Sequence, residues 1–350
     1  MSARWMQDRA KAIVVFGAGA VGCSVAGWIH ERYPHVALFA RGEQAEAIRA
    51  RGLVLAMQGE PPPAAPLRIP VIEDLSQQPA PAIVVIAVKN YDLRAAAEAV
   101  KAAYEDRPLI IGLQNGVENQ RILPLYFSKI VFGVVCFNAW IESPGVVGAE
   151  KRGPILFGTL NGDPELAARM REAVEIFKLG LNADVAQSFQ DTVHAKLILN
   201  LTNSIMTLSG HRFREIGNLR ILKKITLGAL HEGIEIVQAA GYKEAPIPGA
   251  PRWRIIKLAG MLPDFVSDRV FRAFLAAMGL NSMAQDILVR RKTVTEIDSL
   301  DGYFVEMANR NGLRVPIIRA MHRLGKERFT RPDFAPLDVE ELWQAIQKGS

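Results

Sequence analysis

The stretch Ala12–Ile29, AIVVFGAGAVGCSVAGWI, constrains the fold of this chain more than any other part of it. A short apolar run, Ile13–Phe16, precedes three glycines in the spacing G-x-G-x-x-G, and a helical pattern follows from Ser24. A strand, a tight turn and a helix start in this order are the context in which such glycines bind a dinucleotide. We therefore expect an α/β domain of the Rossmann type whose helix start holds the pyrophosphate.

The glycines of this loop have separate expected roles. Gly17 permits the sharp turn, Gly19 leaves room for the pyrophosphate against bare backbone, and Gly22 lets helix and strand pack closely. The stretch is uncharged for as long as a minimal membrane span, but its glycines and its strand-then-helix pattern argue against a span. The expected cofactor contacts are therefore the whole loop: Gly17, Ala18, Gly19, Ala20, Val21 and Gly22.

The length of 350 residues is too great for one ordinary core and predicts two domains. Long helical patterns replace the β-rich runs from about Gln187, so we expect a dinucleotide-binding domain over 11–186 and an all-α domain over 187–350. The formal net charge of +6 comes from Lys and Arg interleaved with Asp and Glu, which argues against nucleic acid. The densest basic segment, Arg319–Arg331, fits a solvated helix face or a terminal tail.

The two cysteines, Cys23 and Cys136, lie far apart and without metal-ligand spacing. This pattern predicts neither a disulfide framework nor a metal site, and it suits a reducing compartment. The first residues contain no apolar core of a signal peptide. We therefore expect a soluble cytoplasmic protein without a membrane partner.

Three further strand ends are expected beside the glycine loop. The run Val36–Phe39 ends near Arg41, where an NAD site would carry an acidic residue; an arginine suits a 2′-phosphate, so we expect NADPH. A solvent-facing turn arginine is the alternative. The continuous apolar runs Ile83–Val88 and Leu109–Leu113 read as buried parallel strands. They deliver Lys89 and Asn115 to the same edge. Further runs at Ile130–Phe137 and Ile155–Gly158 extend the sheet.

The stretch Asp191–Leu208 predicts a mostly apolar helix with a few isolated polar residues. Lys196, Asn200 and Asn203 fall within about 60° of arc on this helix, and Ser204 lies at the margin. Unpaired polar groups in a core cost about 1–3 kcal/mol each, so these residues either face solvent or line a polar cleft. His194 points elsewhere and is expected to be structural.

Helical patterns continue at Leu219–Ala240 and Arg252–Ala277, joined by a proline-rich loop that is either a lid or a spacer. The polar segment Asn281–Gly302 is expected to be helical after Ser282 and carries Glu296. A last apolar helical pattern runs over Leu300–Ala308 and is broken by Pro316.

Taken together, the chain resembles the ketopantoate reductase (2-dehydropantoate 2-reductase) family over nearly its whole length. The matching pieces are GAGAVG at Gly17–Gly22, ARGEQ at Ala40–Gln44, VKNYDL at Val88–Leu93, LQNGVEN at Leu113–Asn119, KLILN at Lys196–Asn200, NSMAQD at Asn281–Asp286 and TEIDSLDG at Thr295–Gly302. The resemblance implies an NADPH-dependent reduction of 2-dehydropantoate to pantoate, a step toward coenzyme A. Hydride delivered to a ketone carbon leaves negative charge on oxygen, which needs a proton and a nearby cation.

The resemblance also implies roles for single residues. Lys196 resembles the general acid, and Glu296 matches the acid near that lysine and the substrate. Asn200 and Ser282 resemble substrate-binding residues, Ser282 through the substrate carboxylate. Arg41 resembles the residue that contacts the 2′-phosphate of the cofactor. Lys89 and Asn115 resemble the pair at the cofactor–substrate edge.

The chain departs from the family pattern at three places. Ser204 stands where a second asparagine is common, and Asn203 lies close enough to the Lys196–Asn200 line to take its place; Asp301 stands where an asparagine is common. The region Pro246–Ala277 is longer than usual. The alternatives are therefore a reductase for another branched 2-keto acid and a non-catalytic NADP(H)-binding sensor. An opine-type or polyol-phosphate dehydrogenase fits the first half only. The sequence is compatible with a homodimer.

Overall fold

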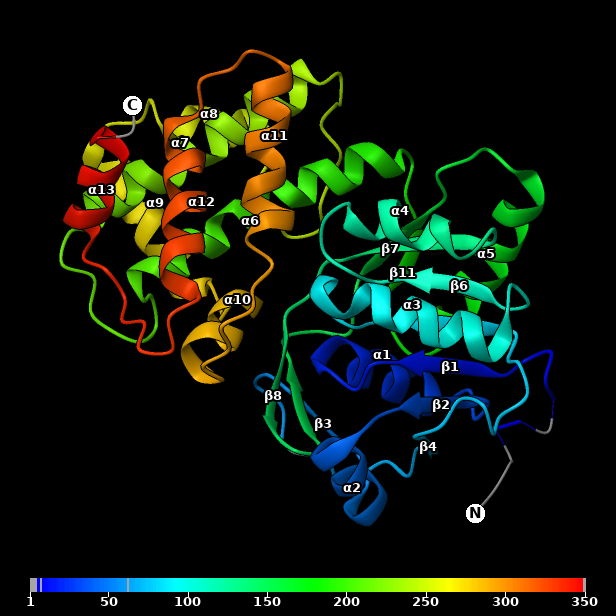
Figure 1. Cartoon of the computed structure of the whole chain (residues 1–350). Coiled ribbons are helices and arrows are strands. Elements are labelled where there is room, and N and C mark those ends of the chain that lie inside the picture. Colours follow the sequence, from blue (N-terminus) through cyan, green and yellow to red (C-terminus); the bar gives the residue numbers. More distant parts are fainter. Residues whose placement is uncertain (1–4, 7, 62, 349–350) are drawn as a thin grey trace. The chain divides into compact units, whose positions relative to one another are not determined.

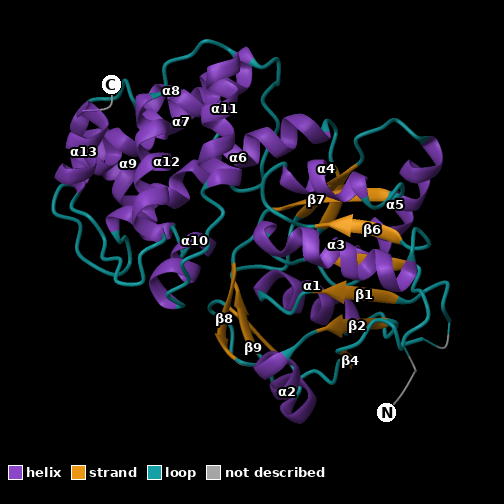
Figure 2. Cartoon of the chain, viewed as in Figure 1, coloured by secondary structure: helices purple, strands orange, loops and turns teal. Residues whose placement is uncertain are grey.

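A computed structural model describes residues 5–6, 8–61 and 63–348, and the chain divides into two compact units, 1–189 and 190–350 (Figure 1). The division falls inside the helix α6 (Phe189–Ser209), after its first residue. The sequence places the boundary slightly earlier, between residues 186 and 187, where the β-rich runs end. Among the described residues, all strands belong to the first unit, and the regular elements of the second unit are all helices (Figure 2).

The first unit is built on an eight-stranded sheet in the order β11-β10-β7-β6-β5-β1-β2-β4. Strands β7, β6, β5, β1, β2 and β4 run parallel to one another. Strand β10 pairs antiparallel with β7 and parallel with β11. This is an open α/β sheet of the predicted Rossmann type. The strands are β1 (Ile13–Phe16), β2 (Val36–Phe39), β4 (Val71–Ile72), β5 (Ile83–Ile86), β6 (Leu109–Gly112), β7 (Ile130–Val135), β10 (Ile155–Gly158) and β11 (Ala183–Val185).

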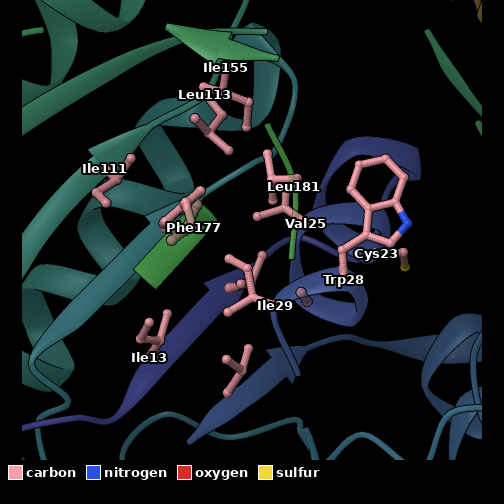
Figure 3. Packing of buried hydrophobic residues seen from close by; sticks show 14 of the residues in the cluster. Ile13, Cys23, Val25, Trp28, Ile29, Ile111, Leu113, Ile155, Phe177 and Leu181 are labelled. Carbon is pink, nitrogen blue, oxygen red and sulfur yellow. The ribbon is translucent and has the colours of Figure 1, made fainter. Parts of the chain in front are cut away.

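The core of this unit lies between the sheet and its helices. Strands β1, β2, β5 and β6 are buried at every position, as their continuous apolar runs predict. In Figure 3, Val25 and Ile29 of α1 lie near Leu181, and Trp28 projects from the same helix. The helices of this unit are α1 (Ala20–His30), α2 (Gly42–Arg51), α3 (Asn90–Tyr104), α4 (Glu118–Ile122) with the short turn η1 (Leu123–Leu125), and α5 (Pro164–Lys178).

A second, three-stranded sheet has no counterpart among the predicted elements. It consists of β3 (Val54–Met57), β9 (Val146–Ala149) and β8 (Ala139–Ser143) in that order. The turn between β8 and β9 contains Gly145, whose φ of 83° suits glycine. The sequence marks this turn through its Pro-Gly pair but assigns no strand on either side.

The second unit is a set of packed helices. They are α6, α7 (Leu219–Ala239), α8 (Trp253–Ala259), α9 (Asp264–Ala277), α10 (Ser282–Ala284), α11 (Tyr303–Arg310), α12 (Pro316–Phe329) and α13 (Val339–Lys348), with π-helical turns η2 (Gln285–Val289) and η3 (Asp298–Gly302). Among the described residues, no helix is long and apolar enough to cross a membrane.

Two helical predictions in this unit need correction, and an alternative left open by the sequence is decided. The stretch Arg252–Ala277 is two helices, because Gly260 and Pro263 end α8 and precede α9. The helix expected after Ser282 passes into η2 and ends at Val289, since Arg291 has a φ of 54°. The basic segment Arg319–Arg331 lies mostly in α12, which buries an apolar face, so it is a helix face rather than a tail.

Candidate active site

The glycine loop follows β1 directly. Helix α1 begins at Ala20, earlier than the predicted start at Ser24, and so includes Gly22 and Cys23. Gly17 has a φ of 114°, and a Cβ at Gly22 would lie 1.8 Å from the Gly17 carbonyl oxygen. At Gly19 a Cβ would meet nothing within 4 Å, so the backbone there is open to a ligand.

The start of α1 suits an anion. Gly19 is its N-cap and supplies no side-chain hydrogen bond, and the first turn contains no acidic residue. The first N–H groups of a helix lack intrahelical acceptors and carry the positive end of the helix dipole. The residues therefore fit a dinucleotide pyrophosphate. Cys23 is packed in the core, where burial raises the pKa of its thiol to about 12, so it is no reactive group.

A pocket of about 280 Å³ lies beside this loop. The ends of β1, β2 and β5 form its floor, and alanines of α3 form one wall. Arg41 lines the pocket, and its guanidinium carbon lies 5.0 Å from the ring centroid of Phe39. A neighbouring pocket of about 210 Å³ shares Arg41 and Phe39 and adds Glu73 and Asp74. Arg41 is exposed and contributes to the lining of both pockets, at the start of α2.

Gln44 of α2 braces the glycine loop, a contact that the sequence did not reveal. Its Nε2 donates to the Ala18 carbonyl oxygen at 3.0 Å, and its Oε1 accepts from the Gly145 N–H at 2.6 Å. The cofactor loop and the β8–β9 turn are thus held by one amide.

The next strand ends carry Lys89 and Asn115. Lys89 is the N-cap of α3, and the side chain of Asn90 donates from Nδ2 to the Asn115 carbonyl oxygen at 2.8 Å. Gln114 Nε2 donates to the carbonyl oxygens of Ile86 at 2.8 Å and Val88 at 3.1 Å. The ends of β5 and β6 are therefore tied together. Asn90 and Gln114 are the sequence neighbours of the predicted residues Lys89 and Asn115. Their side-chain amides at strand ends are the sequence feature that could have indicated these hydrogen bonds.

In the second unit, α6 carries the predicted polar face. Asn200 is only 6% exposed, and its Nδ2 has no acceptor among the described residues. Lys196 and Asn203 are half-buried, and Ser204 is fully buried. A buried amide hydrogen without an acceptor is costly, which makes this face suitable for a polar ligand.

His194 is part of the packing of this unit. One ring nitrogen lies 2.7 Å from the Gln190 carbonyl oxygen, and the other lies 2.8 Å from the Tyr303 hydroxyl. The ring stacks on Tyr242 at 3.6 Å between centroids. Burial lowers the pKa of His194, so its neutral form prevails.

Two segments distant in sequence reach α6. Asn281 Oδ1 accepts from the Ala284 N–H at 2.8 Å and from Thr207 Oγ1 at 3.5 Å, which places Ser282 next to the second half of α6. The segment with the buried Glu296 reaches α6 through Asp301, whose Oδ1 lies 2.6 Å from Ser204 Oγ. Lys196, Asn200, Asn203, Ser282 and Glu296 thus belong to α6 and the two segments that contact it.

Comparison with known proteins identifies the same family in both units. The family model "Ketopantoate reductase PanE/ApbA" matches residues 13–162, and "Ketopantoate reductase PanE/ApbA C terminal" matches residues 188–328. The 2-dehydropantoate 2-reductase of Archaeoglobus fulgidus is 25% identical over 319 residues, which is 90% of this chain and 97% of the relative. That of Pyrococcus horikoshii is 26% identical over 308 residues, 87% of this chain and 93% of the relative.

Solved structures show the same fold. The PanE/ApbA family ketopantoate reductase of Ralstonia eutropha superposes with a TM-score of 0.70 at 26% identity, covering 96% of this chain and 99% of that one. D-Mandelate dehydrogenase, solved with NADH and anilino(oxo)acetate, has a TM-score of 0.72 at 18% identity, with coverages of 96% and 99%. A dimeric ketopantoate reductase from Staphylococcus aureus has a TM-score of 0.64 at 16% identity, covering 97% and 100%. With both family models matched over most of its length, this oxidoreductase belongs to the ketopantoate reductase family.

Proposed function

We propose that the protein reduces 2-dehydropantoate to pantoate with NADPH, in the cytoplasm. The observation that carries the proposal is the face of α6, where Lys196 and the buried Asn200 amide lie one helical turn apart. Asn200 Nδ2 has a hydrogen to donate and no acceptor among the described residues, as a site for an oxygen-rich substrate requires. The full-length relatives named 2-dehydropantoate 2-reductase support the substrate.

When bound, NADPH would supply a hydride for the ketone carbon. Lys196 donates a proton to the developing alkoxide, and its positive charge stabilises that oxygen before the transfer. Asn200 donates to the substrate from its buried amide, and Ser282 binds the carboxylate, with Asn203 adding a further polar group. Glu296, buried on the segment that reaches α6, is the acid assigned to orient Lys196. Lys89 and Asn115 bind at the cofactor–substrate edge.

The choice of NADPH rests on Arg41. This arginine lines the dinucleotide pocket at the end of β2, where a 2′-phosphate would meet its guanidinium. D-Mandelate dehydrogenase, which shares the fold, was solved with NADH, so the fold alone does not select the cofactor.

The experiment is a screen of 2-keto acids with NADPH and NADH in parallel, using the purified full chain. We expect oxidation of NADPH on addition of ketopantoate, and loss of turnover in Lys196→Ala while NADPH still quenches protein fluorescence. Lys129→Ala, a lysine that bonds the Asp106 carbonyl in the first unit, is the matched control. Cofactor binding without turnover of any 2-keto acid would instead support a sensor.

One observation favours a second candidate, a reductase for a different branched 2-keto acid. Ser204, which stands where the family commonly has asparagine, is engaged by Asp301. In this candidate, the side-chain amide of Asn203 takes the place of the asparagine that is common at position 204. Because Asn203 lies one residue earlier on the helix, its amide would contact the substrate from a different direction. Higher kcat/KM for a bulkier keto acid than for ketopantoate would favour this candidate.

We also propose a homodimer. The Staphylococcus aureus relative is described as dimeric, and α8, α9 and their connection expose large apolar side chains, including Met261 at 81% and Phe265 at 78%. The molar mass, measured by light scattering as the protein elutes from a size-exclusion column, tests this proposal. The mass of a monomer at micromolar concentration would contradict it.

A further inference from the structure

Two positions at which the chain departs from the family pattern contact each other. Ser204 on α6 and Asp301 in η3 are 0% and 1% exposed, and Ser204 Oγ lies 2.6 Å from Asp301 Oδ1. This contact joins the helix that carries Lys196 to the segment that carries Glu296. The two departures are therefore one structural feature.

The hydrogen bonds of Ser204 indicate which form of Asp301 is present. Ser204 Oγ carries one hydrogen but lies near two acceptors, Asp301 Oδ1 at 2.6 Å and the Leu201 carbonyl oxygen at 3.2 Å. Both contacts are hydrogen bonds at once if Asp301 carries the proton on Oδ1 and donates it to Ser204. Asp301 Oδ2 has no partner among the described residues, which a carboxylate would tolerate poorly. Burial raises the pKa of Asp301 to about 7, although the bond from Ser204 opposes the shift.

The charged groups around Asp301 do not neutralise it. From α12, His322 and Lys326 lie 2.7 Å and 3.1 Å from Asp298, the exposed acid of the same turn. From α11, Glu306 is paired with Arg310. The same elements also carry other titratable groups, which are Asp191, His194 and Lys196 on α6, Tyr303 on α11, and Arg319, Arg323, Glu327 and Arg328 on α12; Glu296 lies upstream of η3. Among the described residues, none forms an ion pair with Asp301, so a proton is its available neutralising partner.

Ser204 lies on α6 one turn beyond Asn200 and two turns beyond Lys196, on nearly the same face. We propose that Asp301 is a positioning residue that, as the neutral acid, holds the Lys196–Asn200 face of α6 in place through Ser204. Loss of its proton makes Ser204 turn its hydrogen away from Leu201 and leaves a charge in the core, which displaces this part of α6. The catalytic consequence rests on the proposed reductase function; the displacement does not.

The displacement is tested first without activity. The side-chain amide NMR signals of Asn200, assigned from their loss in Asn200→Asp, are followed with pH in the ligand-free full chain. We expect them to shift with a single step near neutral pH in the wild type and in Asp298→Asn, the matched change at the exposed acid of the same turn. Asp301→Asn, which keeps a donor toward Ser204 and cannot ionise, should abolish the step. A step that persists in Asp301→Asn would overturn the proposal, as would its absence from the wild type.

The pH profile of turnover then tests positioning. We expect kcat of the wild type and of Asp298→Asn to fall with a one-proton slope above neutral pH, while Asp301→Asn removes that step and NADPH affinity stays unchanged. Ser204→Ala removes the contact through which Asp301 reaches α6, so the kcat step should be lost or strongly reduced in this variant as well. The same kcat step in Asp301→Asn would assign it to another group and overturn the role. If no 2-keto acid is reduced at any pH, the proposed function fails, while the Asn200 signals still decide the displacement.

Discussion

Replacing Asp301 by asparagine should stabilise the protein by an amount that grows with pH. Burial raises the pKa of this carboxyl in the folded chain from 3.8 to about 7. Between these values the folded state holds a proton that the unfolded state has released, so stability falls as pH rises. Each pKa unit corresponds to about 1.36 kcal/mol, and the shift therefore sets an upper limit of about 4 kcal/mol on the loss above pH 7.

Asparagine removes this loss because it is neutral at every pH and retains a hydrogen toward Ser204. Urea unfolding of the wild type and Asp301→Asn, read by circular dichroism at pH 4, 6 and 8.5, measures the difference. We expect similar midpoints at pH 4 and a higher midpoint for the variant at pH 8.5. Asp298→Asn is the control, since the pKa of exposed Asp298 is lowered overall by its bonds to His322 and Lys326, against the effect of burial. Equal differences between wild type and Asp301→Asn at all three pH values would refute the reasoning.

Four further substitutions test other parts of the structure. Gly22→Ala should abolish NADPH binding by distorting the loop, because its Cβ would lie 1.8 Å from the Gly17 carbonyl oxygen. Gly19→Ala should leave the melting temperature unchanged and lower the affinity for NADPH, measured by fluorescence titration. An unchanged affinity in Gly19→Ala would contradict the role of the open backbone at this position. Arg41→Ala should raise KM for NADPH at least tenfold but hardly change KM for NADH, with Arg49→Ala on the same helix as control; equal effects on both cofactors would exclude a 2′-phosphate contact. Glu232→Ala should lower the free energy of unfolding by about 1–3 kcal/mol, because Glu232 accepts the N–H groups of Ile317 and Ile318 at the start of α12; an equal loss in exposed Glu235→Ala would contradict this.

The sequence predicted most of the sheet because its central strands are short, continuous apolar runs. Ile13–Phe16 and Ile83–Ile86 are buried on both faces, and burial of that kind leaves an unmistakable pattern. The small sheet escaped because β3 is half-buried throughout and β8 ends exposed, so their hydrophobic signal is weak. The break in Arg252–Ala277 was visible as Gly260 and Pro263 but was outweighed by the helical pattern around it.

The candidate site was predictable where its residues share one element. Lys196 and Asn200 fall on one face of a helix because helical geometry places them there. The Ser204–Asp301 contact was not predictable, since it depends on how η3 packs against α6, which no local pattern encodes. Gln44 lies within the motif ARGEQ, but its contact to Ala18 depends on the tertiary fold.

The Gln44 amide has a consequence for attempts to change the cofactor. Arg41, the N-cap of α2, and Gln44, in its first turn, lie on one short helix segment, and Gln44 also holds the Ala18 carbonyl. A redesign that replaces the whole 41–44 segment to accept NADH would release the glycine loop along with the proposed 2′-phosphate contact. Affinity for both cofactors would then fall together. Replacing Arg41 alone, with Gln44 retained, would change the proposed 2′-phosphate contact and leave the hydrogen bond between Gln44 and the glycine loop in place.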